Sequence, residues 1–178
     1  RDPAGGYFST PDDGEPLLFR PKEGHDGAVP SGNAVTLLNL VRLGRLTGDP
    51  GREEAAAALA RAFAGPLVQM PSAHSQWLIA LELLAAPSCE VVIAGDPASD
   101  LTAALLAVAR EVSLPGLTLL LRPGGEEGEA IAGLAPFTRP MGPVGGRPAA
   151  YVCRGASCRP PVTDPGELAA LLEEPAKG

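Results

Sequence analysis

The segment from residue 20 to residue 33 holds the densest group of side chains that could bind a ligand or move a proton. It reads RPKEGHDGAVPSGN. Arg20 and Lys22 could neutralise an oxyanion. His25 or Asp26 could exchange protons with a bound molecule. The segment also precedes an expected helix, whose N-terminal N–H groups suit an anionic or hydroxylated ligand. These residues indicate a candidate site for a small polar molecule.

The same segment has a purely structural interpretation. Ser31 or Asn33 would cap the following helix, and Asp26 would accept hydrogen bonds from backbone N–H groups. Arg20 would pair with a nearby carboxylate. Spacing alone favours this structural interpretation over a ligand site. Both hypotheses stay open.

A second candidate group opens a helix further along the chain. His74 lies close to Gln76 and Trp77, and an imidazole beside an indole could line a sugar pocket through stacking and hydrogen bonding. The alternative is a partly exposed histidine at a helix start with Trp77 in the core. The spacing favours this alternative.

The remaining motifs argue against metal, nucleotide and hydrolase sites. Cys153 and Cys158 are separated by four residues and Cys89 is the only other cysteine, so a disulfide or two structural thiols are favoured over a metal site. Asp96 and Asp100 are interpreted as turn and cap residues, because the turn before them lacks a dinucleotide fingerprint and the chain has no P-loop. A nucleophile elbow is also missing. We predict no metal and no cofactor.

Composition excludes several classes of protein. The chain has 178 residues, of which 45% are hydrophobic and 20% charged, so it is not wholly disordered. The net charge of −7 disfavours nucleic acid and anionic membranes as partners. Three cysteines favour a reducing, cytoplasmic setting over a secreted disulfide scaffold. The 22 glycines and 20 prolines indicate short elements joined by many turns.

Periodicity predicts a helical first half. A hairpin with Asp13 and Gly14 near its tip is expected before residue 20. Helices are then expected over residues 33–46, 52–65 and 72–86. The helix over 33–46 is apolar on more than one side, which is typical of a helix buried between neighbours.

In the second half of the chain the spacing of apolar residues changes, and strands alternate with helices. A strand at 90–94, a helix at 101–112 and a strand at 117–121 predict a right-handed βαβ unit. The last expected elements are a helix at 126–134, a strand at 149–152 and a helix at 164–173. The predicted fold class is therefore α plus α/β, with a division between residues 1–87 and 88–178.

Five segments in sequence order resemble a known family. They are GGYF at 5–8, RPK…DGA…PSGN at 20–33, LLNL…RLTG at 37–48, VVIAGD at 91–96, and YVC…C…PPVTDPGEL at 151–168. In this order they resemble the C-terminal part of the spermatogenesis-associated protein 20 / YyaL family, thioredoxin-domain-containing proteins with a toroid similar to N-acylglucosamine 2-epimerases. The resemblance implies that residues 1–87 form the last hairpins of an (α/α)6 toroid and that residues 88–178 form a small α/β segment. With the absence of an initiator Met, it leads us to expect a fragment of a longer protein.

The resemblance also implies that the polar loop lies at the mouth of the toroid cavity. On the first hypothesis this cavity binds or isomerises a carbohydrate, with Asp26 or His74 as the catalytic acid or base. An epimerase needs two proton-transfer groups, and His25 and His74 are the only imidazoles in the chain. The expected substrate-binding residues are Arg20, Lys22, Ser31, Asn33 and Trp77.

The second hypothesis is a non-catalytic interaction scaffold that serves a thioredoxin-like domain elsewhere in the parent protein. A few helices cannot close a toroid, so the remainder of the parent or a second copy of the chain is the expected partner. Convergence of Arg20, Lys22, Asp26 and His74 on one polar pocket would favour chemistry. Pairing of these groups elsewhere in the chain would favour the scaffold.

Overall fold

A computed structural model describes residues 2, 4–155 and 157–174. The chain divides into two compact units, one made of residues up to 44 together with 49–85, the other of residues 45–48 together with those from 86 onward. Within the described residues there are six α-helices and one mixed four-stranded sheet. This confirms the predicted class in its coarse form, α plus α/β.

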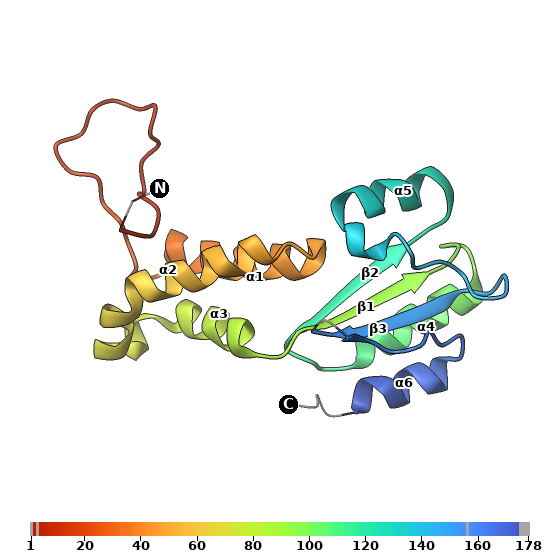
Figure 1. Cartoon of the computed structure of the whole chain (residues 1–178). Helices are drawn as coiled ribbons and strands as arrows, with labels where there is room; N and C mark the ends of the chain where they lie inside the picture. Colours follow the sequence, from red (N-terminus) through yellow and green to blue (C-terminus); the bar gives the residue numbers. More distant parts are fainter. Residues whose placement is uncertain (1, 3, 156, 175–178) are drawn as a thin grey trace. The chain divides into compact units, whose positions relative to one another are not determined.

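The predicted helices of the first half all form. They are α1 (Gly32–Thr47), α2 (Pro50–Gln69), the 3-10 turn η1 (Pro71–Ala73) and α3 (Ser75–Ala85) (Figure 1). Asp49 caps α2 by accepting a hydrogen bond from the Gly51 amide at 3.0 Å. α2 continues through Pro66, well past its predicted end, because Leu67 packs into the core and is only 6% exposed.

One apolar core joins the three helices. Its centre is Trp77, which is fully buried and stacks at a tilt on Phe63 with 4.6 Å between ring centroids. The buried members are Ala34, Leu37, Val41, Ala56, Leu59, Phe63, Leu67, Trp77 and Ala80. Burying this aromatic pair is expected to contribute strongly to the stability of the helical unit.

α1 is not buried on all sides, contrary to prediction. Ala34, Leu37 and Val41 follow helical spacing and form a single buried stripe. Val35 and Leu43 lie off this stripe and are 38% and 42% exposed. The sequence pattern was that of a helix with neighbours on several sides, and the described chain covers only one.

The predicted hairpin is wrong as well. No strand occurs in the described residues before α1, and residues 9–21 form an irregular loop (Figure 1). The Ser9 amide closes this loop by donating to the Pro21 carbonyl at 2.9 Å. Prolines at 11, 16 and 21 lack the N–H groups that a strand ladder needs, which explains why the turn signature at Asp13 and Gly14 did not produce paired strands.

The second unit is built on the predicted βαβ element. Its members are β1 (Cys89–Ala94), α4 (Asp100–Glu111), β2 (Leu117–Arg122), α5 (Gly125–Leu134), η2 (Pro136–Thr138), β3 (Ala149–Arg154), β4 (Ser157–Cys158) and α6 (Pro165–Glu173). The strand order is β2-β1-β3-β4. β1 is parallel to β2, while β3 is antiparallel to both β1 and β4.

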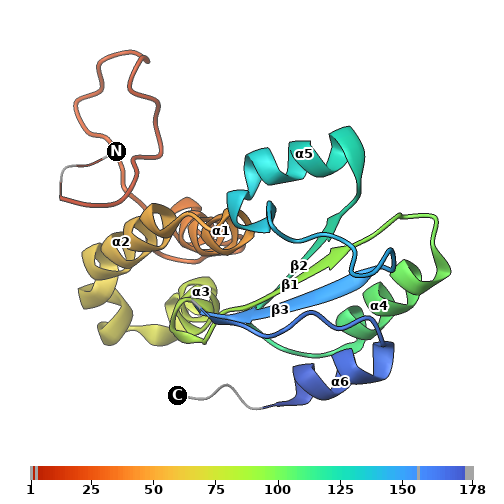
Figure 2. The ribbon, with the colours of Figure 1, turned by 45° about the vertical axis from the view of Figure 1, so that its right-hand side comes forward.

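Helices cover both faces of this sheet. α4 and α6 lie on one face and α5 on the other (Figure 2). The first face is the larger core, in which the buried residues are Cys89, Val91, Ile93, Leu105, Ala109, Ala150, Val152, Leu168 and Leu172. On the second face Val92, Met141 and Cys153 are buried together.

The cysteine pair adopts one of the two states that the sequence allowed. Cys153 and Cys158 form a disulfide between β3 and β4, whereas Cys89 is a free, buried thiol. The two-residue strand β4 was not predicted, because so short a segment shows no periodicity.

Candidate functional site

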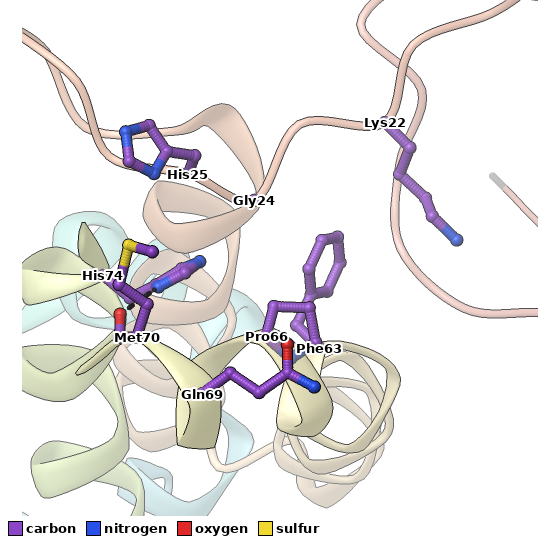
Figure 3. A pocket seen from close by; sticks show the side chains of 8 residues that line it. All are labelled: Lys22, Gly24, His25, Phe63, Pro66, Gln69, Met70 and His74. Atoms are coloured by element: carbon purple, nitrogen blue, oxygen red, sulfur yellow. Dashed lines mark hydrogen bonds between the residues drawn. The ribbon is translucent and has the colours of Figure 1, made fainter. Parts of the chain in front are cut away.

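A pocket of about 360 Å³ lies in the helical unit. One wall is the loop over residues 22–25, and the other is the end of α2 with the turn that follows it (Figure 3). The lining residues are Lys22, Gly24, His25, Phe63, Pro66, Gln69, Met70 and His74. The mixture of aromatic and apolar walls with a few polar groups is typical of small-molecule sites.

Two imidazoles meet at this pocket. The rings of His25 and His74 are edge to face, with 5.9 Å between their centroids. His74 is 5% exposed, and its Nδ1 lies 2.8 Å from the Met70 carbonyl oxygen (Figure 3). Because a carbonyl only accepts, this bond requires a proton on Nδ1, which leaves Nε2 of a neutral ring as an acceptor. His25 is exposed.

Backbone hydrogen bonds hold the two histidines in place. The amide of His74 donates to the Pro71 carbonyl at 3.0 Å and ends η1. The Asp26 amide donates to the Ala73 carbonyl at 2.9 Å, which ties the loop that carries His25 to this turn. The imidazole pair therefore rests on two segments far apart in the sequence.

Asp26 is a structural bridge. Its Oδ1 accepts from the Ser31 amide and its Oδ2 from the Gln76 amide, both at 2.8 Å. These amides lie at the starts of α1 and α3, where N–H groups lack intrahelical partners and a carboxylate is favoured. Both oxygens are used in this way, and Asp26 does not line the pocket.

Asn33 and Ser31 are also engaged by their own chain. The Asn33 side chain is 3% exposed; its Oδ1 accepts from the Tyr7 amide at 2.8 Å, and its Nδ2 donates to the carbonyls of Tyr7 and Glu23. The Ser31 hydroxyl accepts from the Ala34 amide at 3.2 Å. These contacts fix the N-terminal segment to the start of α1.

Trp77 lies behind the pocket. Its Nε1 donates to the Gly24 carbonyl at 2.7 Å, so the buried indole is hydrogen-bonded to the pocket loop. A Cβ at Gly24 would lie 2.5 Å from Cδ1 of Phe63. Only glycine lets the loop approach the aromatic pair this closely.

The two basic residues differ in their relation to the pocket. The Arg20 guanidinium binds Asp12 at 2.8 Å and the Thr10 carbonyl at 2.6 Å, and does not line the pocket. Lys22 lines it, but its Nζ binds Asp2 Oδ2 at 2.7 Å and the Gly5 carbonyl at 2.8 Å.

The structure therefore brings together only part of the predicted set. Lys22 and His74 reach the pocket, while Arg20, Asp26, Ser31, Asn33 and Trp77 are not among its lining residues. His25 was an alternative proton-transfer group and not one of the predicted site residues, and Phe63 and Gln69 were not predicted to line a site. Gln69 lies beyond the predicted end of α2 at residue 65, and Phe63 lies inside that helix as one of its apolar residues.

Acid is expected to loosen the N-terminal segment first. The hydrogen bond from Lys22 lowers the pKa of Asp2 below its ordinary value of 3.8, and the bond from Arg20 lowers the pKa of Asp12 in the same way. Since both carboxyls are more acidic in the folded chain, their stabilisation is present above about pH 4 and is lost as the pH falls through the folded pKa values. Between pH 5 and about pH 2, the NMR amide shifts of Gly5 should move toward random-coil values. Native shifts retained at the acid end would contradict this.

Two features are absent from the described residues. No group of three or more His, Cys, Asp or Glu side chains lies close enough to hold a metal ion there. Among the described helices, none has the length and apolar character needed to cross a membrane.

Comparison with known proteins identifies the relatives of this chain. It is 33% identical over 171 residues to spermatogenesis-associated protein 20 of Rattus norvegicus, which covers 96% of the chain. The chain is a relative of spermatogenesis-associated protein 20. The mouse protein gives the same identity and coverage, and the human protein is 33% identical over 94% of the chain. The family resemblance drawn from the five segments is thereby confirmed.

The chain matches only a part of each relative. The chain spans about a fifth of the length of these curated relatives, 22% for the rat protein and 21% for the human protein. This proportion is consistent with a C-terminal part of that family. No protein-family profile matches the chain.

Proposed function

We propose that the helical unit is a binding module for a small hydroxylated molecule of the carbohydrate class. The observation that carries this proposal is the meeting of His25 and His74 at a pocket of about 360 Å³. This volume is at the lower end of the range for ligand pockets, roughly 300–1,000 Å³, and suits a monosaccharide. The Phe63 ring offers an apolar face to a sugar, and the Gln69 amide offers a donor and an acceptor.

Any isomerase or epimerase chemistry in this pocket would use the two histidines. Asp26 is a poor candidate for acid or base, because both its oxygens already accept backbone hydrogen bonds. His74 supplies Nε2 as an acceptor, and the adjacent exposed His25 supplies a second proton-transfer group. In this proposal Arg20, Ser31, Asn33 and Trp77 support the pocket without touching the ligand.

Titration calorimetry with glucose, mannose and N-acetylglucosamine tests the binding proposal. Removing the exposed His25 ring in His25→Ala should weaken sugar binding by about tenfold, the value of one lost hydrogen bond, without changing the melting temperature. Asp13→Ala, an exposed change elsewhere in the N-terminal segment, should leave binding unchanged. Absence of heat with every sugar, or equal binding by His25→Ala, would contradict the proposal.

The second candidate function is an interaction scaffold within a longer toroid protein, in which α1, α2 and α3 are toroid helices and a thioredoxin-like domain lies elsewhere. Two observations favour it. Arg20 and Asp26 are satisfied by their own chain, and apolar side chains remain exposed on these helices, namely Val35, Leu43, Val68, Leu78 and Ile79. Such faces are typical of surfaces that another part of a protein covers.

The gene itself tests the scaffold proposal. We expect the reading frame to continue upstream of the codon for residue 1 and to encode further toroid helices and a thioredoxin-like domain. In that longer protein the side chains of Val35 and Leu43 should become protected from hydroxyl-radical labelling. A start codon immediately upstream, preceded by an in-frame stop codon, would contradict it.

A further inference from the structure

The disulfide of the α/β unit joins one buried and one accessible sulfur. Cys153 and Cys158 face each other in the antiparallel pairing of β3 with β4. Cys153 is 4% exposed and packs with Val92 and Met141. Cys158 is exposed. A thiol arriving from solvent therefore meets the sulfur of Cys158 first.

Next to the buried cysteine, Arg154 holds the end of α6. Its guanidinium donates to the carbonyls of Leu171 and Leu172 at 3.2 Å and also to the carbonyl of Glu174. Carbonyls in the last turn of a helix lack intrahelical partners, and a cation there is favoured by the helix dipole.

The segment that follows β4 contacts the same end of α6. Arg159, which follows Cys158, pairs with the Glu174 carboxylate at 2.8 Å. Its amide donates to the Val152 carbonyl at 2.9 Å. The two arms that the disulfide joins are thus both attached to the C-terminal turn of α6.

Docking of α6 in turn covers a free thiol. Leu168 and Leu172 are at most 1% exposed and share the core beneath α6 with Cys89. Burial raises the pKa of the Cys89 thiol above its ordinary value of 9.0. Cys89 should therefore react slowly with alkylating reagents while α6 stays in place.

We propose that the Cys153–Cys158 disulfide is a redox-sensitive clamp on α6 that a dithiol reductant opens. A thiolate of the reductant attacks Sγ of Cys158, and the sulfur of Cys153 leaves and takes up a proton. The second thiol of the reductant then attacks the mixed disulfide and releases Cys158, which takes up the other proton. Two electrons pass to the protein, and the reductant departs as its own disulfide.

Opening the clamp has a structural consequence. β4 has only two residues, Ser157 and Cys158; beyond it the Arg159 amide is hydrogen-bonded to the Val152 carbonyl and Val162 pairs with Ala150 of β3. Cutting the covalent link therefore loosens β4 itself, while these bonds keep the chain after it beside β3. Loosening of β4 moves the Arg159 side chain away from Glu174, so that Arg154 alone holds the helix end. The last turn of α6 then frays, and Cys89 becomes accessible.

Reduction of the folded chain with dithiothreitol, read by hydrogen exchange and by mass spectrometry after iodoacetamide labelling, tests the proposal. We expect Cys153 and Cys158 to be labelled under native conditions. Amide protection over residues 170–174 should fall by about tenfold or more, and labelling of Cys89 should accelerate by a similar factor. Protection within β2, at the edge of the sheet farthest from β4, should not change.

A double variant, Cys153→Ser with Cys158→Ser, supplies the control. Without reductant it should show the exchange of the reduced protein at 170–174, and dithiothreitol should have no effect on it. Unchanged protection of α6 after complete reduction would overturn the proposal, and so would a disulfide that resists millimolar dithiothreitol in the folded protein. The measurement on the unmodified chain stands even if the variant fails to fold, because β2 reports on the fold.

Discussion

Trp77→Ala is expected to destabilise the helical unit by about 3–5 kcal/mol, the usual cost of removing a large buried aromatic side chain. Trp77 is fully buried, stacks on Phe63 and donates to the Gly24 carbonyl. Its loss leaves a cavity in the core and an unpaired carbonyl in the pocket loop. Urea unfolding followed by far-UV circular dichroism measures the change, and the α/β unit should give a separate, unaltered transition.

Two variants of the same helix sharpen the test. Trp77→Phe keeps a stacked ring but loses the hydrogen bond to Gly24, so we expect a smaller loss of about 1–2 kcal/mol. Ile79→Ala removes an apolar side chain that is 54% exposed and should change stability by at most about 0.5 kcal/mol. A folded, stable Trp77→Ala protein that had lost only sugar binding would instead support the predicted role of Trp77 as a ligand contact.

Asp26→Ala is expected to destabilise the helical unit by about 3 kcal/mol, since two charge-assisted hydrogen bonds to helix N-termini are lost together. The unpaired amides would belong to Ser31 and Gln76, so α1 and α3 would both lose their connection to the pocket loop. The chain has a single tryptophan, Trp77. Its fluorescence therefore reports unfolding of the helical unit alone.

The controls for Asp26 separate charge from geometry. Asp26→Asn keeps one acceptor but turns an NH₂ group toward a backbone N–H, so it should recover less than half of the lost stability. Asp13→Ala removes an exposed carboxylate and should change stability by at most about 0.5 kcal/mol. If Asp26→Ala unfolded at the same urea concentration as the parent chain, the bridge would not be structural and a catalytic role for Asp26 would regain support.

Together these two variants discriminate between the predicted and the observed roles of the polar loop. Asp26 and Trp77 were predicted to be site residues because a carboxylate and an indole are common in sugar sites. In the folded chain they connect the loop to the helices, and His25 with His74 forms the pocket instead. Stability should thus respond to Asp26 and Trp77, and ligand binding to His25.

The sequence by itself determined the α-helices and the longer strands, but not the irregular loop before α1 or the two-residue strand β4. Two patterns reflect local backbone preferences and the need to bury one face. They are the helical spacing of apolar residues over 33–46 and the short run rich in β-branched residues at 91–94. These are properties of neighbouring residues, so they can be read without the fold. The parallel pairing of β1 with β2 followed from the helix between them. The five ordered segments likewise fixed the family.

Only the tertiary structure decided which side chains are free to act. The Asn33 side chain is hydrogen-bonded to Tyr7, which lies 26 positions earlier in the chain. The Asp26 side chain is hydrogen-bonded to Gln76, which lies 50 positions later. Such partners are set by how the loop folds back on α1 and α3, and no local pattern encodes that distance. The same physical reason, long-range pairing of polar groups during burial, moved the candidate site from Asp26 to His25 of the loop together with His74, which precedes α3.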